Sequence, residues 1–401
     1  MQSLNEQFNS LRQSPTVAMA DRILALKASG RKIIGLQVGD PDFPTPPAVM
    51  EVAFQAMQAG LTHYGPSKGY PELRNAAALK LERDSHVSYD PDTELLVTHG
   101  GIHAYYLAMQ SILNPGDEVL VPDPSWGTHA NMATMLRGTV IRVPAPAENG
   151  FIPYFESWEE ALTPKTRVIV LNYPSNPTGA YPTREYLQQL QDFAAKHNLW
   201  IVSDAVYEDL YYEEKPTSAA AFEGAKDRTI LVNSLSKSYA MTGWRVGYLA
   251  APQVVIENAL KAGQNSITCV APFIQKAAAF ALTDPEIQQV TADMRAAYAR
   301  RRELVLRIAD ELESAALSVS KGEKVIVTPP QGAFYFFLDF RPLKMTSLEI
   351  CERILEEAGV GLVPGSGFGA QGEGFVRMTI AASDEDVEAG FRKIVEWAEK
   401  Q

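Results

Sequence analysis

The chain has 401 residues, of which 46% are hydrophobic and 21% are charged, so its composition excludes a disordered or fibrous protein. A formal net charge of −12 without basic runs argues against nucleic-acid binding and against binding to an anionic membrane surface. The two cysteines, Cys269 and Cys351, lie far apart in the chain, which excludes a disulfide scaffold. The first residues lack the basic and apolar segments of a secretory signal, so we expect a cytoplasmic location.

The N-terminal segment combines a helical pattern at 17–28 with a proline-rich connection that ends at Pro47. Short β-branched runs then alternate with helical patterns such as 103–113 and 183–197. The predicted strands are 95–98, 118–122, 140–143, 167–171, 199–203, 229–233 and 246–250. This alternation predicts a mostly parallel seven-stranded sheet with helices on both faces, in which ligands bind at the carboxyl ends of the strands.

A different pattern follows residue 284. It predicts a long helix over 284–315, strands at 324–328, 332–338 and 374–380, and helices over 347–358 and from 385 onward. These elements indicate a smaller α+β domain on which the N-terminal segment packs. We therefore expect an N-terminal segment at 1–45, a large domain at 46–283 and a small domain at 284–401.

The most informative segment is SLSKSYAMTGWRVG, which follows the strand predicted at 229–233. Lys237 is thereby placed near the carboxyl end of a buried strand. The hydroxyl groups of Ser234 and Ser236 flank it, and Arg245 follows eight residues later. A lysine among hydroxyl groups and an arginine suits a Schiff-base lysine beside a phosphate site.

This segment resembles the lysine signature of the class I and II aminotransferases, which have the aspartate aminotransferase fold (fold type I) and use pyridoxal 5′-phosphate. Other family-like motifs occur in the expected order: GDPDF at 39–43, HYG at 63–65, LR at 73–74, THGGI at 98–102, DPSW at 123–126, NYPSNPTG at 172–179, SDAVY at 203–207 and FVRM at 375–378. The resemblance extends from about residue 14 to the C-terminus. Its N-terminal motifs are similar to the branch that includes bacterial aspartate, alanine, aromatic and kynurenine aminotransferases.

The resemblance implies that Lys237 carries the cofactor and moves the substrate α-proton. Protonation of the pyridine nitrogen makes the ring an electron sink, and the carboxylate of Asp204, at a strand end, can supply the counter-charge. Tyr207 and Asn176 can bond the phenolic oxygen of the ring. Trp126 can stack on the ring.

A phosphate group needs N–H donors and a cation. Gly100 and Gly101 precede a predicted helix, where backbone N–H groups and the positive helix end favour an anion. Ser234, Ser236 and Arg245 add hydroxyl donors and a guanidinium fork. We expect these residues to bind the cofactor phosphate.

The substrate contacts follow from the same resemblance. Arg377 matches the arginine that binds the α-carboxylate, and Gly39 lets the backbone approach the same group. Asn176 and Trp126 complete the predicted substrate site. Ile102, in the phosphate-binding turn, stands where some aspartate-type relatives carry a cation, so we expect a neutral, aromatic or cationic substrate side chain rather than a second carboxylate.

The tyrosine that matches Tyr64 reaches the phosphate of the neighbouring subunit in the family, which implies a homodimer with shared active sites. The implied reaction exchanges the amino group of an L-amino acid with a 2-oxo acid. An eliminase, cyclase or oxidase on the same fold would keep Lys237, Asp204 and Arg377 and stays an alternative.

Two other interpretations have less support. A non-catalytic regulator with this fold would carry a DNA-binding domain, which we do not expect, because few residues precede residue 14 and the sequence has no basic patch. His99 and His103 are separated by glycines, and we expect no metal site there. His129 follows Trp126 by three residues and either faces the substrate or caps a helix.

Overall fold

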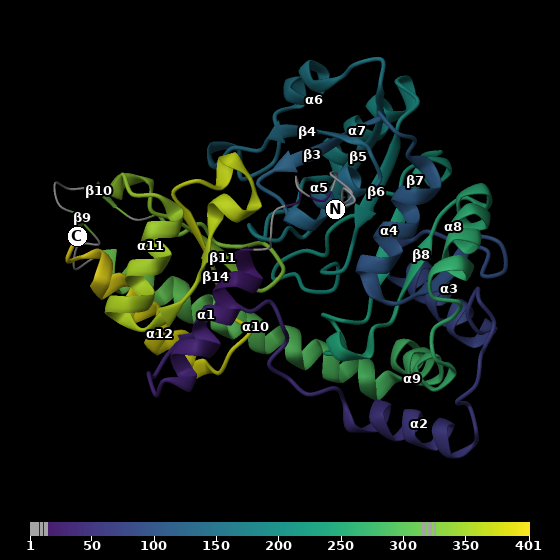
Figure 1. Cartoon of the computed structure of the whole chain (residues 1–401), viewed down its shortest axis with the longest axis horizontal. Helices are drawn as coiled ribbons and strands as arrows, with labels where there is room; N and C mark the ends of the chain where they lie inside the picture. The colour runs from purple at the N-terminus through teal and green to yellow at the C-terminus, as the bar shows by residue number, and fades with distance from the viewer. Residues whose placement is uncertain (1–7, 9–10, 12–14, 314–317, 320–322, 325) are drawn as a thin grey trace, which may run out of the picture.

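The computed structural model describes residues 8, 11, 15–313, 318–319, 323–324 and 326–401, and the strands among them form four sheets (Figure 1). The largest sheet has seven strands in the order β2-β8-β7-β6-β5-β3-β4. Their bounds are β2 Leu95–Thr98, β3 Glu118–Asp123, β4 Thr139–Pro144, β5 Thr166–Asn172, β6 Trp200–Asp204, β7 Thr229–Ser234 and β8 Gly247–Ala250.

The neighbouring strands β4, β3, β5, β6 and β7 pair in parallel. Strand β8 is antiparallel to both of its neighbours, β2 and β7. All strands except β8 therefore run in one direction. Each of the seven predicted strands lies in this sheet, so the prediction of a mostly parallel seven-stranded sheet is confirmed.

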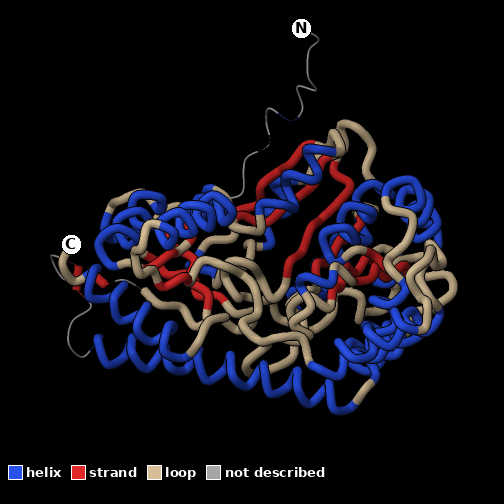
Figure 2. Tube along the Cα trace, turned by 60° about the horizontal axis from the view of Figure 1, so that its bottom comes forward, coloured by secondary structure: helices blue, strands red, loops and turns tan. Residues whose placement is uncertain are grey.

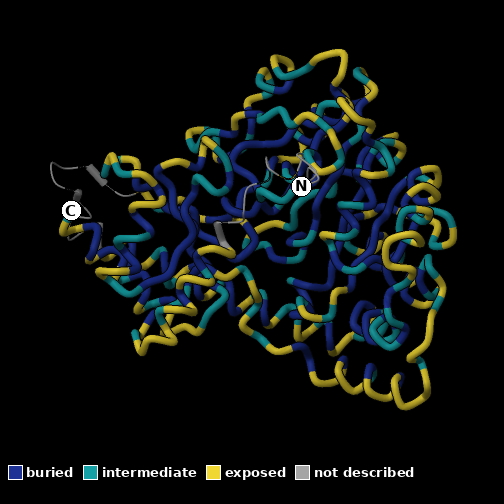
Figure 3. Tube along the Cα trace, viewed as in Figure 1, coloured by how far each residue is buried: buried dark blue, intermediate teal, exposed yellow. Residues whose placement is uncertain are grey.

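Helices cover both faces of the large sheet (Figure 2). On one face of the sheet, Val168 and Val170 of β5 belong to an apolar cluster with residues of α4, α5 and α8. On the other face, Ile169 and Leu171 of β5 belong to a cluster with residues of α6 and α7. Because successive side chains of a strand point to opposite faces, a continuous apolar run is what a strand buried on both sides requires. The buried strands are the dark core of Figure 3. The helices around the sheet are α2 Pro47–Gln58, α3 Pro71–Ser85, α4 Gly100–Ile112, α5 Gly127–Met135, α6 Phe155–Ala161, α7 Arg184–Lys196, α8 Gln253–Ser266 and α9 Pro272–Thr283.

A second part of the molecule combines both ends of the described chain. Strand β1 pairs in parallel with β12, with Ile34 opposite Val360, and α1 contacts β12 and β13. The long helix α10 contacts α9 of the first part and α12 of the second (Figure 1). The elements are α1 Pro15–Ala28, β1 Ile34–Gly35, α10 Pro285–Glu313, β9 Ser318–Val319, β10 Glu323–Lys324, β11 Tyr335–Asp339, α11 Ser347–Arg353, β12 Val360–Gly361, β13 Val363–Pro364, β14 Phe375–Thr379 and α12 Asp384–Ala398.

The antiparallel sheet β11-β14-β13 forms the core of this second part. Its buried side chains, such as Phe336, Val376 and Met378, pack against Phe391 of α12. The predicted smaller α+β unit is thus present, and the N-terminal segment packs on it. The domain boundaries at residues 45 and 283 stay predictions.

Three predicted bounds were wrong. The helix expected from residue 103 begins at Gly100, so both glycines of the turn belong to its first turn. The strand expected at 332–338 begins at Tyr335, because the Ala333 N–H donates instead to the Leu210 carbonyl at 2.8 Å. At 324–328 only β10 and an isolated bridge from Ile326 to Asp339 form, and residue 325 lies outside the described residues.

One predicted helix changes its geometry along its length, and the end of another is not tested. The helix expected over 347–358 changes to a π-helix at Ile354–Ala358. The predicted end of the long helix at 315 lies outside the described residues. No helix in the described part of the chain is long and apolar enough to cross a membrane.

Candidate functional site

A cavity of about 500 Å³ opens at the carboxyl ends of β5, β6 and β7 and extends to β11 and β14. The edge of the large sheet and the second part of the molecule therefore line it together. The predicted site residues on its lining are Gly39, Gly101, Ile102, Trp126, Asn176, Asp204, Tyr207, Ser234, Ser236, Lys237, Arg245 and Arg377. The sequence prediction thus identified most of one continuous cavity wall.

Lys237 is held against the N-terminal segment by a hydrogen bond. It follows β7, and its Nζ donates to the carbonyl oxygen of Gly39 at 2.5 Å. Burial, opposed by the nearby carboxylate of Asp40, lowers the pKa of Lys237 to about 8. A lysine with such a pKa is partly neutral near physiological pH, and the neutral amine is the nucleophile.

Asp204 ends β6, and its Oδ2 lies 2.9 Å from Nε2 of His129. The His129 ring is fully buried, at 4.8 Å from the ring of Tyr105 and 5.2 Å from that of Trp126. The histidine therefore lies within α5 and orients the carboxylate of Asp204, which answers the question that the sequence left open. The only sequence signal for this role was the spacing of His129 three residues after Trp126, because residues three apart lie on the same face of a helix.

Tyr335 is a site residue that sequence reasoning missed. Its hydroxyl lies 2.8 Å from the hydroxyl of Tyr207, and burial raises the pKa of both phenols. A Cβ on Gly39 would overlap the Tyr335 hydroxyl, so the glycine is needed for this close approach. Tyr335 joins the cavity only through the fold, since β11 brings it there from the second part of the molecule.

Arg377 is a buried cation, with only 2% of its surface exposed. Its Nη1 donates to Oδ1 of Asn176 at 2.9 Å and its Nη2 to the carbonyl oxygen of Gln37 at 2.6 Å. Its Nε has no hydrogen-bond partner among the described residues. Burial lowers the pKa of Arg377. A buried guanidinium whose partners here are neutral is a favourable site for a carboxylate.

The first turn of α4 and the loop after β7 form a cradle of donors. Gly100 has φ +76°, and a Cβ there would lie 3.0 Å from Nη2 of Arg245. The Ser234 hydroxyl donates to the Ser236 hydroxyl at 2.8 Å. A helix N-terminus, hydroxyl groups and a guanidinium are the donor set that binds a phosphate. The residues present therefore fit a phosphate-bearing cofactor.

Two predicted residues are not on the cavity lining. Tyr64 is 86% exposed in the single chain. Gly100 lies beside Arg245. Further lining residues that were not predicted as site residues are Val17, Asp40, Thr128, Asn172, Val206, Thr242 and Tyr335.

Comparison with known proteins decides the family. Residues 31–394 match the family described as aminotransferase class I and II. The chain belongs to this family. It is 38% identical over 368 residues to an aspartate aminotransferase of Pyrococcus abyssi, with 92% of each chain covered. It is also 39% identical over 357 residues to aromatic-amino-acid aminotransferase 2 of Thermococcus litoralis, with 89% of each chain covered.

The fold is confirmed by solved structures. The Thermus thermophilus aspartate aminotransferase with maleate superimposes with a TM-score of 0.92 at 36% identity, over 99% of this chain and 100% of that one. The predicted family and aspartate aminotransferase fold are therefore confirmed. The protein is an enzyme that transfers amino groups of amino acids, and the alternative of elimination, cyclisation or oxidation is not supported.

Proposed function

We propose that this aminotransferase uses pyridoxal 5′-phosphate carried by Lys237. The observation that supports this most strongly is the buried position of Lys237, with a lowered pKa, on the same cavity as the carboxylate of Asp204 and the phosphate-type cradle. When bound, the cofactor's pyridine ring withdraws electrons from the substrate's α-carbon.

Asp204 would hold the pyridine nitrogen protonated, and the hydrogen bond from His129 keeps the carboxylate in place. Tyr207 and Asn176 would bond the phenolic oxygen, and Trp126 would stack on the ring. Each of these side chains lies on the same cavity, and Asn176 also receives a hydrogen bond from Arg377. The cofactor and the substrate would therefore share one contact residue.

The phosphate would lie in the cradle at the start of α4. A Cβ at Gly100 would lie 3.0 Å from Nη2 of Arg245 and one at Gly101 would lie 2.8 Å from Val206, so the two glycines let the start of α4 approach these side chains closely. Ser234, Ser236 and Arg245 would supply hydroxyl and guanidinium donors. Hydrogen bonds from these donors are stronger to an anion than to a neutral group. The bound phosphate would therefore fix the orientation of the whole cofactor.

In the reaction, Lys237 acts as both base and acid. Lys237 would hold the cofactor in the resting enzyme, and once free its Nζ would remove the proton from the substrate's α-carbon and give a proton back later in the transfer. A pKa of about 8 suits both roles near neutral pH. Arg377 holds the substrate's α-carboxylate during the transfer, and a 2-oxo acid accepts the amino group in the second half of the cycle.

We propose a substrate whose side chain lacks a second carboxylate. Among the described residues, the only cations on the cavity lining are Lys237, Arg245 and Arg377, and each already has a role. Ile102 and Val17 contribute apolar surface instead. One relative is named for aspartate and another for aromatic amino acids, so the family as a whole allows either side chain.

We further propose a homodimer with shared active sites, in the cytoplasm. The exposed Tyr64 would reach the phosphate of the second subunit. Nearby, α2 exposes Met50, Phe54 and Met57, an apolar surface that a second subunit would cover.

A single-turnover experiment tests the reaction. The holoenzyme mixed with one amino acid and no acceptor should form one 2-oxo acid per active site and then stop. Added 2-oxo acid should restart it. Continued product formation without any acceptor would instead indicate elimination or oxidation and would contradict transamination.

A further inference from the structure

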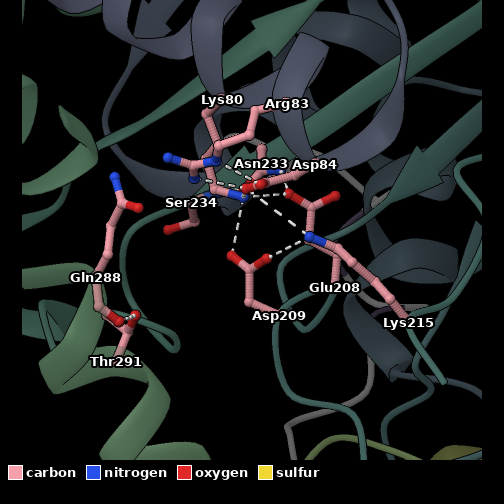
Figure 4. A network of polar contacts seen from close by, with 10 residues as sticks. All are labelled: Lys80, Arg83, Asp84, Glu208, Asp209, Lys215, Asn233, Ser234, Gln288 and Thr291. Atoms are coloured by element: carbon pink, nitrogen blue, oxygen red, sulfur yellow. Dashed lines mark hydrogen bonds and ion pairs between the residues drawn. The ribbon is translucent and has the colours of Figure 1, made fainter. Parts of the chain in front are cut away.

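A buried ion cluster lies outside the cavity lining (Figure 4). Its centre is Lys80 of α3, which is 2% exposed. The Lys80 Nζ lies 3.0 Å from Asp84, 2.9 Å from Glu208 and 2.9 Å from Asp209. None of these residues lines the cavity in the described structure, so the proposed chemistry does not account for them.

The cluster balances its own charge. Arg83 pairs with Asp84 at 2.6 Å and Lys215 pairs with Asp209 at 3.1 Å. Burial opposes the charge of Lys80, yet attraction to Asp209 and Glu208 holds its pKa well above the ordinary value. Lys80 therefore stays charged over the physiological pH range.

Two members of the cluster are sequence neighbours of cavity residues. Glu208 follows Tyr207, and Asn233 precedes Ser234. One oxygen of Glu208, Oε1, accepts both from Lys80 and, at 2.7 Å, from Nδ2 of Asn233. The side-chain oxygen of Asn233 then accepts from the backbone N–H of Ser234 at 2.8 Å. A continuous series of hydrogen bonds thus connects α3 with the phosphate cradle.

The series continues within the cradle itself. The Ser234 hydroxyl accepts from the Ser236 backbone N–H at 3.1 Å and donates to the Ser236 hydroxyl at 2.8 Å. The orientation of Ser234 therefore sets that of Ser236, directly before Lys237. An apolar cluster of similar volume would stabilise the fold about equally well, because buried ion pairs lose much of their attraction to desolvation. Stability alone is thus a weak reason for this arrangement.

We propose that Lys80, acting through Glu208 and Asn233, positions the serine hydroxyls of the phosphate cradle. These three are positioning residues, since none of them touches the cavity. The inference rests on the proposed use of pyridoxal phosphate. It predicts that breaking the series weakens recognition of the phosphate group and leaves recognition of the ring unchanged.

The test compares the cofactor-free protein's affinity for pyridoxal phosphate and for pyridoxal, which lacks the phosphate. Asn233→Ala should raise the dissociation constant for pyridoxal phosphate about 10-fold or more, which corresponds to one lost charge-assisted hydrogen bond. The dissociation constant for pyridoxal should change less than about 2-fold. Absorbance titration measures both.

A matched control removes a different ion of the same cluster. Arg83→Met deletes the partner of Asp84 without touching Glu208 or Asn233, and both affinities should stay at the wild-type value. Lys80→Met should show the same selective loss as Asn233→Ala. If Lys80→Met fails to fold, Asn233→Ala still decides, because it leaves Lys80 paired with its three carboxylates.

Equal losses for the two ligands, or no loss for either, would overturn the positioning role while leaving the proposed function intact. A wild-type protein that binds pyridoxal phosphate no better than pyridoxal would overturn both. The two failures are therefore distinguishable in one set of titrations.

Discussion

Replacing Arg377 by methionine should chiefly remove recognition of the substrate's α-carboxylate. The guanidinium uses one donor of each terminal nitrogen on Asn176 and on the Gln37 carbonyl, so its other N–H groups can hold a carboxylate. A hydrogen bond to a charged group contributes about 1.5–3 kcal/mol. Arg377→Met should therefore weaken amino acid binding about 10- to 150-fold.

The assay compares an amino acid with the primary amine that lacks its carboxylate. Wild-type holoenzyme should bind the amino acid more tightly, whereas Arg377→Met should bind the two ligands nearly equally. Methionine is a suitable replacement because it fills much of the same buried space without a charge. The variant should keep its fold, since it removes a buried cation that has no described carboxylate partner.

Arg301 provides a matched control. It is also a buried arginine, but Asp42 and Asp384 already pair with it. Arg301→Met should lower the melting temperature and keep the preference for the amino acid over the amine. If Arg377→Met still prefers the amino acid to the amine, or if it binds both ligands more weakly by the same factor, the role of Arg377 in carboxylate binding is refuted.

Three further results are expected. In the cofactor-free protein, modification of Lys237 by an amine-reactive reagent should rise with a midpoint near pH 8, because burial favours the neutral amine; a midpoint near 10.4, the value of an ordinary lysine, would contradict this. Ile102→Lys should raise kcat/KM for aspartate relative to a neutral amino acid about 1.5- to 5-fold, the value of a partly exposed ion pair, and Ile102→Met should not. Mixing inactive Lys237→Ala and Tyr64→Ala subunits should restore activity in hybrid dimers, whereas an active monomer by light scattering would refute shared sites.

Local patterns in the sequence were sufficient for much of the fold. The strands of the large sheet are short apolar runs, such as Val168–Leu171 within β5, with turn residues on both sides. Lys237 was predicted because the hydroxyl residues Ser234 and Ser236 lie beside it after a predicted strand and Arg245 follows eight residues later. Signals of this kind depend only on residues that are close in the sequence, so they can be recognised without knowledge of the tertiary structure.

The missed features all depend on long-range pairing. His129 meets Asp204 across 75 positions of the chain, and Tyr335 meets Tyr207 across 128. Lys80 also reaches Glu208 across 128 positions. A single sequence carries no signal for such contacts, because the spacing within each segment looks like that of an ordinary helix or strand. The start of α4 at Gly100 was missed for a related reason, since glycine has a low helix propensity and tertiary packing decides the helix end.

The most direct test of the proposed chemistry is to locate the covalent attachment of the cofactor. Protein loaded with pyridoxal phosphate is reduced with borohydride, digested, and mapped by mass spectrometry. We predict that the reduced adduct is found on the peptide containing Lys237. An adduct on another lysine, or none, would contradict the assignment of Lys237.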